Sequence, residues 1–247
     1  MKRFIYRIFV YLNLLVFTAS CNDPDSFDCV KKTGEVIEEE RILETFTKLV
    51  IHHDINVSLL NGDNQKVIVK AGENLMSKIS LEVEGNELVI RNNNTCNWTR
   101  SYGGIDVFVT SNDLTYIKSS GSGNINSVDT YHIEKQLNIE CKDGSGDFNL
   151  DVSGNKLVVV NNSLANINLS GSITNLTVGY YYNYGRCHAR DLVAQNIFIN
   201  HLGVNDILVK SNNKIRGNIE STGNVIYYGN ANDVKMNITG TGQLIKM

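Results

Sequence analysis

Acidic and basic side chains gather in the second half of the chain in a pattern that could support catalysis. The set comprises Asp143, Asp147, Asp151, Arg186, His188 and Arg190. Polysaccharide lyases on β-helices use carboxylate-bound Ca²⁺ together with a basic residue that abstracts a proton, and these residue types would suit that chemistry. Spacing alone does not bring the two groups together, because solvated strand faces carry the same pattern. No pair of carboxylates stands out as a glycosidase pair either. We therefore assign no catalytic residue and no metal site.

The clearest candidates for ligand binding are tyrosines followed by two basic residues. They are Tyr180, Tyr181, Tyr182, Tyr184, Arg186 and His188. Aromatic rings exposed on a flat sheet stack on sugar rings or anchor protein partners. The alternative is that every second tyrosine belongs to the core, and the sequence leaves both interpretations open. The expected ligand class is a glycan or a surface protein.

A repeat positions these residues, and its clearest copy reads S-S-G-S-G-N-I from Ser119 to Ile125. Apolar anchors recur about every 20 residues, which is the period of a solenoid. The anchors are Ile125, Phe148, Ile167, Cys187, Ile207, Val225 and Leu244. Small or turn-forming residues stand two and four positions before most anchors, as a tight corner requires. We expect some of the corner glycines to have positive φ.

Apolar residues alternate within this repeat, and the alternation predicts a parallel β-helix with three short strands per coil. Similar short strands are expected from Phe46 to Val109. At about 20 residues per coil, the domain would hold about nine or ten coils. A sandwich or propeller is the fold alternative, but a propeller blade needs about 40 residues. The sequence therefore predicts an all-β solenoid.

Polar residues form two further columns, one residue before and one residue after the anchors. The first holds Asn124, Asp147, Asn166, Arg186, Asp206, Asn224 and Gln243, and the second holds Asn126, Asn149, Asn168 and His188. One interpretation is a polar face that grips sugar hydroxyls or a cation. We favour the other, in which stacked amides hydrogen-bond along the solenoid.

The N-terminus has the features of a bacterial lipoprotein signal. A basic start precedes an apolar run that is too short to span a bilayer comfortably, and Thr18-Ala19-Ser20-Cys21 follows. We expect residues 1–20 to be a signal peptide, Cys21 to be acylated, residues 21–35 to be a tether and residues 36–247 to be the β-helix domain. Acidic residues after Cys21 favour the outer membrane, at the cell surface or on its periplasmic face.

Six short segments carry the most specific sequence signal. Three are copies of the repeat: G-S-G-N-I (Gly121–Ile125), D-G-S-G-D-F (Asp143–Phe148) and T-G-T-G-Q-L (Thr239–Leu244). Three are N-terminal: D-C-V-K-K-T-G (Asp28–Gly34), A-G-E-N-L (Ala71–Leu75) and T-C-N-W-T-R-S-Y (Thr95–Tyr102). Together they resemble the putative auto-transporter adhesin head GIN domain family and its lipoprotein members. The resemblance implies a right-handed β-helix and adhesion by analogy, and it brings no catalytic residue set.

Four cysteines remain once Cys21 is acylated, and an even number in an exported chain permits disulfides. Cys29 falls in the tether and Cys96 in a polar loop, where a disulfide would fasten the N-terminal segment to the solenoid. Cys141 and Cys187 fall in strands, where buried free thiols are ordinary. We predict a disulfide between Cys29 and Cys96 only.

The charge balance gives no case for nucleic acid, because 23 basic and 26 acidic residues leave a net charge of −3. No cofactor is implied. The favoured function is a non-catalytic, lipid-anchored binding or adhesion module of the cell envelope. One alternative is a carbohydrate-active enzyme built on a β-helix. The other is a structural scaffold that self-associates through the open ends of its helix.

Overall fold

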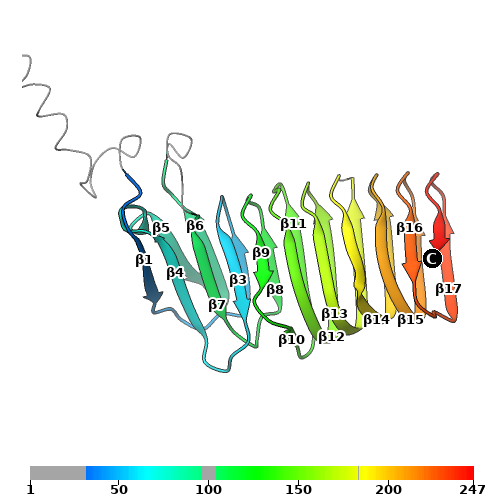
Figure 1. Ribbon diagram of the computed structural model, residues 1–247, viewed down its shortest axis with the longest axis horizontal. Helices are drawn as coiled ribbons and strands as arrows, with labels where there is room; N and C mark the ends of the chain where they lie inside the picture. Colours follow the sequence, from blue (N-terminus) through cyan, green and yellow to red (C-terminus); the bar gives the residue numbers. More distant parts are fainter. Residues whose placement is uncertain (1–31, 96–103, 183) are drawn as a thin grey trace, which may run out of the picture.

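The computed structural model describes residues 32–95, 104–182 and 184–247, and these form an elongated stack of strands (Figure 1). Strands account for 61% of the described residues and helix for 2%, which confirms the all-β prediction. Cys21, Cys29 and Cys96 lie outside the described residues. The lipid anchor, the tether and the Cys29–Cys96 disulfide therefore stay predictions.

The N-terminal part contains seven described strands and one short helix. They are β1 (Val36–Arg41), β2 (Lys48–Ile51), β3 (Asn56–Leu60), β4 (Lys66–Gly72), α2 (Glu73–Met76), β5 (Ile79–Glu84), β6 (Glu87–Asn92) and β7 (Asp106–Thr110). The short strands expected in this region are present. Helix α2 falls where the sequence offers no pair of capping residues, and it makes only one turn.

The continuous repeat supplies the remaining strands. They are β8 (Tyr116–Ser119), β9 (Ile125–Ser127), β10 (Tyr131–Ile133), β11 (Leu137–Lys142), β12 (Phe148–Asn162), β13 (Ile167–Tyr181), β14 (Cys187–Leu202), β15 (Ile207–Ile219), β16 (Val225–Tyr228), β17 (Asp233–Ile238) and β18 (Leu244–Lys246). Four of them, β12 to β15, are 13 to 16 residues long and turn a corner of the solenoid without a break. Strands expected to be separate are therefore fused there.

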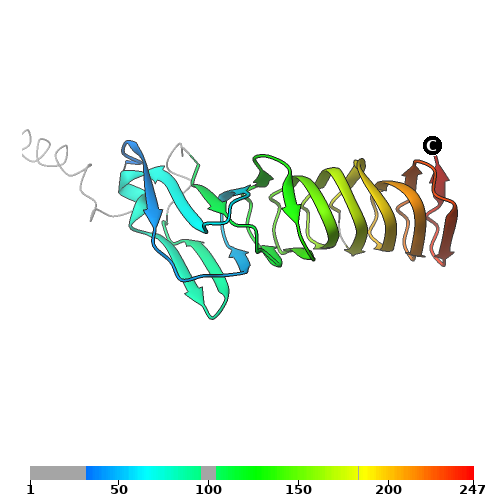
Figure 2. The same ribbon diagram turned by 90° about the horizontal axis from the view of Figure 1, so that it is seen from below.

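Parallel strands stack into two sheets that run along the rod (Figure 2). Sheet 1 holds β6, β2, β8, β11, the second halves of β12 to β15, and β17, in that order. Sheet 2 holds β7, β3, β9, the first halves of β12 to β15, β16 and β18. A third side pairs β10 with the middle of β12. This arrangement confirms the parallel β-helix.

The solenoid makes about six turns, fewer than the nine or ten expected. The difference arises because the N-terminal part does not stack in chain order. Strands β2 and β3 lie between β6–β7 on one side and β8–β9 on the other. Strand β4 then runs antiparallel to β1 and β7, and β5 runs antiparallel to β6. A count based on length alone cannot anticipate strands that turn back along the stack.

Strand β1 is an outer strand of the N-terminal end, since it pairs only with β4 among the described strands, and it carries charged side chains. Glu38 pairs with Lys70 at 3.0 Å and Glu40 with Lys66 at 2.7 Å, both partners lying on β4. Charged residues on an edge strand discourage pairing with a strand of another molecule. Self-association through the ends of the helix stays a prediction.

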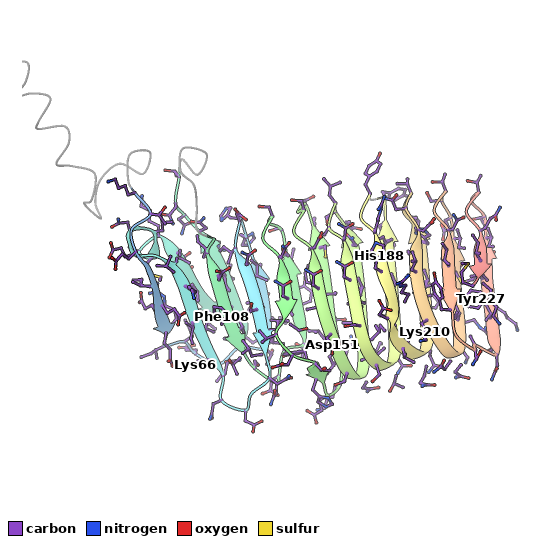
Figure 3. All side chains as sticks on the ribbon, in the orientation of Figure 1. Lys66, Phe108, Asp151, His188, Lys210 and Tyr227 are labelled. Carbon is purple, nitrogen blue, oxygen red and sulfur yellow. The ribbon has the colours of Figure 1, made fainter. Side chains whose placement is uncertain are left out.

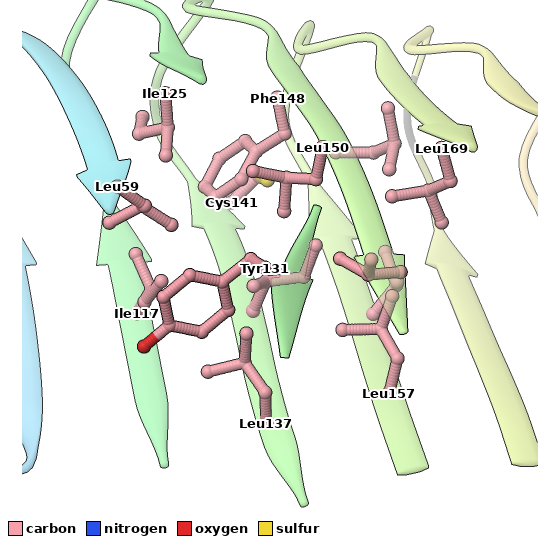
Figure 4. Close-up of a cluster of buried hydrophobic side chains, with 14 of the residues drawn as sticks. Leu59, Ile117, Ile125, Tyr131, Leu137, Cys141, Phe148, Leu150, Leu157 and Leu169 are labelled. Carbon is pink, nitrogen blue, oxygen red and sulfur yellow. The ribbon is translucent and has the colours of Figure 1, made fainter. Parts of the chain in front are cut away.

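The predicted anchors form one inward column. Ile125, Phe148, Ile167, Cys187, Ile207, Val225 and Leu244 pair in this order from coil to coil. All but the last are fully buried. Figure 4 shows Ile125 and Phe148 side by side, with Leu150 and Cys141 close to the ring. The anchor prediction is confirmed, and this column is the spine of the hydrophobic core.

The corner glycines are required by close packing and not by positive φ. A Cβ added to Gly123 would overlap the carbonyl oxygen of Ile55, and one added to Gly146 would overlap the carbonyl oxygen of Gly123. Positive φ occurs at other glycines, including Gly154 (φ 126°) and Gly171 (φ 99°), inside the long strands. The expectation of positive φ at the corner glycines was therefore wrong, because at Gly123 and Gly146 the backbone of the neighbouring coil takes the space of a side chain.

Candidate functional site

The tyrosine cluster divides between the core and the surface. Tyr180 is fully buried, and its hydroxyl donates a hydrogen bond to the carbonyl oxygen of Arg186 at 2.9 Å. Its ring meets the ring of His201 edge-on, with 6.5 Å between the centroids. A ligand cannot reach this ring. For Tyr180 the core interpretation therefore replaces the ligand-binding one.

Tyr180 belongs to a set of buried polar residues that fasten the corner after sheet 1. Asn161, Tyr180 and His201 stack in register on three successive coils. Asn161 donates to the carbonyl oxygen of Ala165 at 2.8 Å, and the backbone N–H of Gly203 donates to Nδ1 of His201 at 3.3 Å. Burial lowers the pKa of His201, although the charge of Asp206 partly opposes this. Each of these side chains therefore hydrogen-bonds to the backbone of the loop that follows its own strand.

The other three tyrosines are at the surface. Tyr181 is half-buried, and its ring lies over Gly179, where any side chain would collide with it. Tyr182 and Tyr184 are 86% and 69% exposed in the turn that follows β13. Tyr182 also has a positive φ of 50°. Of the four tyrosines, three therefore remain accessible to a ligand.

A polar groove of about 370 Å³ lies on sheet 2, and one of the predicted residues, His188, lines it. The groove is lined by Ser127, Asn149, Leu150, Asp151, Asn168, Leu169, Ser170, His188 and Asp191. Asp151 on β12 and His188 on β14 are two of the positions along the rod that Figure 3 labels. Arg186 is exposed but does not line the groove.

One wall of the groove is the amide ladder that the sequence predicted. Asn149 donates to Asn126 at 2.8 Å, and Asn168 donates to Asn149 at 2.7 Å. His188 occupies the next position in register, so the ladder ends there. The polar column before the anchors works differently, because its side-chain oxygens accept from backbone N–H groups of the next coil, as Asn124 does from Asp147 at 2.9 Å. Both columns thus contain hydrogen bonds along the solenoid.

The floor of the groove contains a carboxylate that is only half satisfied. Asp151 accepts a hydrogen bond from the Ser170 hydroxyl on one oxygen at 2.7 Å. Its other oxygen, Oδ1, is buried and has no hydrogen-bond partner among the described residues. Such an oxygen costs about 1 to 3 kcal/mol relative to a satisfied one. A donor brought by a ligand could supply the missing bond once the carboxylate rotates.

A β-bulge shapes the far wall of the groove. His188 pairs with Asn168 and Asp191 pairs with Ser170, so two residues of β14 lie opposite Leu169. Bulges redirect side chains and are common beside functional sites. The exposed Asp191 is placed in the groove by this shift. Sequence reasoning missed Asp191 and Ser170, because the one-residue change in repeat length does not show where the extra residue lies.

The other predicted acidic and basic residues are not gathered here. Asp147 accepts from the backbone and the side chain of Asn166 at 2.8 and 3.1 Å, and Asp143 lies in a turn with φ of 58°. Arg190 lies 3.8 Å from Asp191 in an exposed ion pair. Within the described ranges, no three His, Cys, Asp or Glu residues are arranged so that they could hold a metal ion. The calcium-dependent arrangement considered from the sequence is therefore not formed by these residues.

Cys141 and Cys187 are buried free thiols, which is ordinary for cysteines in strands. Burial raises the pKa of Cys187 to about 12 and raises that of Cys141 further. Both thiols are therefore protonated at neutral pH. They fill space in the core and are not nucleophiles.

The family model described as "Putative auto-transporter adhesin, head GIN domain" matches residues 45–231, which is most of the chain. The chain belongs to this family. The resemblance seen in the sequence is thereby confirmed, and head GIN members are described as adhesins. No curated protein sequence matches the chain.

Solved structures share the head GIN fold at low sequence identity. The crystal structure of a putative adhesin from Bacteroides fragilis has a TM-score of 0.77 at 18% identity and covers 86% of this chain and 97% of its own. That of a putative lipid binding protein from Parabacteroides distasonis has a TM-score of 0.66 at 18% identity, with coverage of 87% and 97%. That of a putative adhesin from the same organism has a TM-score of 0.60 at 15% identity, with coverage of 87% and 98%. At such identities the likeness shows the fold alone.

Of the described helices, none has the length and apolar composition needed to cross a membrane.

Proposed function

We propose that this protein is a non-catalytic binding module of the bacterial cell envelope, held to the outer membrane by a lipid on Cys21. Membership in an adhesin family supports binding or adhesion at a cell surface as the general function. The rod contributes flat faces whose spacing is fixed by the strand stack. A rigid, repetitive surface of this kind suits a ligand that is itself repetitive, such as a glycan.

The half-satisfied carboxylate of Asp151 is the observation that carries this proposal. Asn149 and Asn168, which also line the groove, hydrogen-bond to each other. Asp151 has one oxygen with no partner among the described residues, beside Asn149, Asn168 and His188, which offer further donors and acceptors. Unsatisfied buried polar atoms are uncommon in proteins. We infer that hydroxyl groups of the ligand bind in this groove.

The second candidate function is a glycan-cleaving enzyme, which one observation favours. Asp151 and Asp191 lie in one groove at positions two coils apart, because both stand in register with Ser170. Two strand spacings are about 10 Å. This separation is close to that of the two carboxyl groups in inverting glycosidases. Binding without turnover remains our proposal, since Asp191 is exposed and lies in an ion pair with Arg190.

A Cys21→Ala chain is expected to lose its membrane association. The proposed anchor depends on acylation of this thiol, and several acyl chains bind a membrane firmly. The measurement is partition of the protein from whole cells between detergent and aqueous phases. Wild type should enter the detergent phase, whereas the variant should stay in the aqueous phase. A variant that still enters the detergent phase would rule out the lipid anchor, and protease treatment of intact cells would then identify the exposed side.

Cells that display the full chain are expected to adhere to glycan- or protein-coated surfaces several-fold better than cells without it. Replacing Asp151 and His188 together with alanine should remove most of the difference, because both side chains line the groove. The matched control replaces Asp129 and His132, an exposed pair elsewhere on the rod. Equal adhesion with and without the chain on every surface would refute the proposed function. Equal losses of adhesion in both double variants would show that the groove is not the binding site.

A further inference from the structure

A second candidate surface lies on the outer face of sheet 1, away from the groove of Asp151. Its centre is Phe198 on β14, whose ring is 43% exposed although both chain neighbours, Ile197 and Ile199, are buried. In register, Phe198 lies between Thr177 on one coil and Arg216 on the next. A shallow groove of about 350 Å³ lies here. The ring therefore stands on a flat sheet with its surface open to a ligand.

Amide ladders run along both sides of the Phe198 ring. On one side Asn196 donates to Asn175 at 3.1 Å, and Asn213 donates to Asn196 at 2.8 Å. On the other side Asn218 donates to Asn200 at 2.8 Å. An amide has two N–H donors and two acceptor lone pairs, and a ladder position uses one of each. Asn196 and Asn200 flank the ring with donors and acceptors to spare for hydroxyl groups.

The same face is positively charged. The described residues that line this groove include Lys156, Lys214 and Arg216 and no carboxylate. Arg216 pairs with Asp233, and that hydrogen bond, together with the charges of Lys235 and Lys214, lowers the pKa of the Asp233 carboxyl. The chain as a whole has a net charge of −3, so this local excess of cations is not a general property of its surface.

The cations are spaced to contact a polymer. Lys156, Asn175, Asn196 and Lys214 occupy one register column on successive coils. Lys156 and Lys214 are therefore about three strand spacings apart, or about 14 Å. An extended chain lying along the solenoid would meet Lys156, pass the Phe198 ring and the amides, and reach Lys214 and Arg216.

We propose that the face centred on Phe198 binds an acidic polysaccharide, with a sugar ring stacked on Phe198, hydroxyl groups on Asn196 and Asn200, and carboxylates on Lys156 and Lys214. The inference rests on the proposed binding function and names its ligand class. Aromatic rings stack on the apolar faces of sugars, and cations bind carboxylates most strongly where amides add hydrogen bonds. Tyr181, on the same outer face over Gly179, widens the platform by one coil. An anionic membrane is the less favoured ligand, since the amide ladders on both sides of the ring match hydroxyl groups and not acyl chains.

The test measures binding of the full chain, in mild detergent, to immobilised polygalacturonate, alginate and hyaluronan. Dextran is the uncharged control, and vesicles containing phosphatidylglycerol test the membrane alternative. Wild type should bind at least one uronate polymer and not dextran, and added salt should weaken the binding. Phe198→Ala should bind about tenfold more weakly. Lys214→Glu reverses a surface charge and leaves the core untouched. It should bind the uronate polymer at least as weakly as Phe198→Ala does.

Matched controls come from the outer face of sheet 2. Phe108→Ala removes the same ring from β7, and Lys210→Glu reverses the same charge on β15. Both should bind within about twofold of wild type, and all four variants should keep the wild-type unfolding midpoint within about 3 °C. Unchanged binding of Phe198→Ala and Lys214→Glu, equal binding to dextran, or retention by vesicles alone would overturn the inference. Absence of polymer binding while displaying cells still adhere would overturn this inference and leave the proposed function standing.

Discussion

A Phe148→Ala chain is expected to lose about 3 to 5 kcal/mol of unfolding free energy, the usual cost of removing a buried phenyl ring. Phe148 is fully buried in the anchor column, where it pairs with Ile125 below and Ile167 above. Each coil depends on its two neighbours for its core, so a cavity at this position weakens two coil interfaces. The measurement is equilibrium unfolding in urea, followed by circular dichroism.

The matched control for this prediction is Phe198→Ala. The chemical change is the same, but this ring is 43% exposed on the outer face of sheet 1. Its loss should cost less than about 1 kcal/mol. Similar losses in the two variants would contradict the inward anchor column, because residues of that column and of the outer face would then be equally buried.

A Gly146→Ala chain is expected to be destabilised by about 3 kcal/mol or more, the upper range for overpacking a tight site. The added methyl group would overlap the carbonyl oxygen of Gly123 on the preceding coil, and neither backbone can move without separating the two coils. The measurement is the urea midpoint together with the yield of soluble protein. A stable Gly146→Ala protein would show that the corners are more loosely stacked than described.

Gly85→Asn serves as the control for the corner glycine. Gly85 has a positive φ of 67°, a Cβ added to it would meet nothing within 4 Å, and asparagine tolerates this conformation. Its substitution should change the unfolding free energy by less than about 1 kcal/mol. The pair separates the steric role of Gly146 from the conformational role that positive φ gives to Gly85.

The repeated part of the fold was predictable because its signal is local and periodic. Each anchor, from Ile125 to Leu244, sits at the same place in its repeat, and parallel stacking then brings equivalent positions into register. The amide ladder of Asn126, Asn149 and Asn168 follows from the same register. The reason for the corner glycines was not predictable, since overlap with a neighbouring backbone is a property of the stack and not of one corner.

The N-terminal part was less predictable because its order in the stack differs from its order in the chain. Strands β2 and β3 have the ordinary alternation of apolar residues. This alternation does not indicate that the later strands β6 and β7 pair with them on the N-terminal side of the stack. The antiparallel pairing of β4 with β7 has the same alternation as a parallel pairing would have. Pairing direction is set by the path of the chain, which a pattern of apolar residues does not record.

The candidate sites were predictable only in part. Burial of Tyr180 beside an accessible Tyr181 follows from strand alternation, but the sequence left open which of the two faced inward. Asp191 joins Asp151 through a bulge, and Phe198 joins two amide ladders through register across three coils. Such groupings appear only when the coils are stacked. Of the six residues predicted to bind a ligand, His188 is the one that lines the polar groove.

The central claim is that this solenoid binds glycans without cleaving them. The most direct measurement incubates the full chain with a panel of acidic and neutral polysaccharides and records, in the same samples, the polymer retained and the polymer chain length. We predict saturable retention of at least one polysaccharide, with chain length and reducing ends unchanged after prolonged incubation. Shortening of a polymer that scales with protein concentration and disappears in Asp151→Asn would contradict the claim, as would failure to retain any member of the panel.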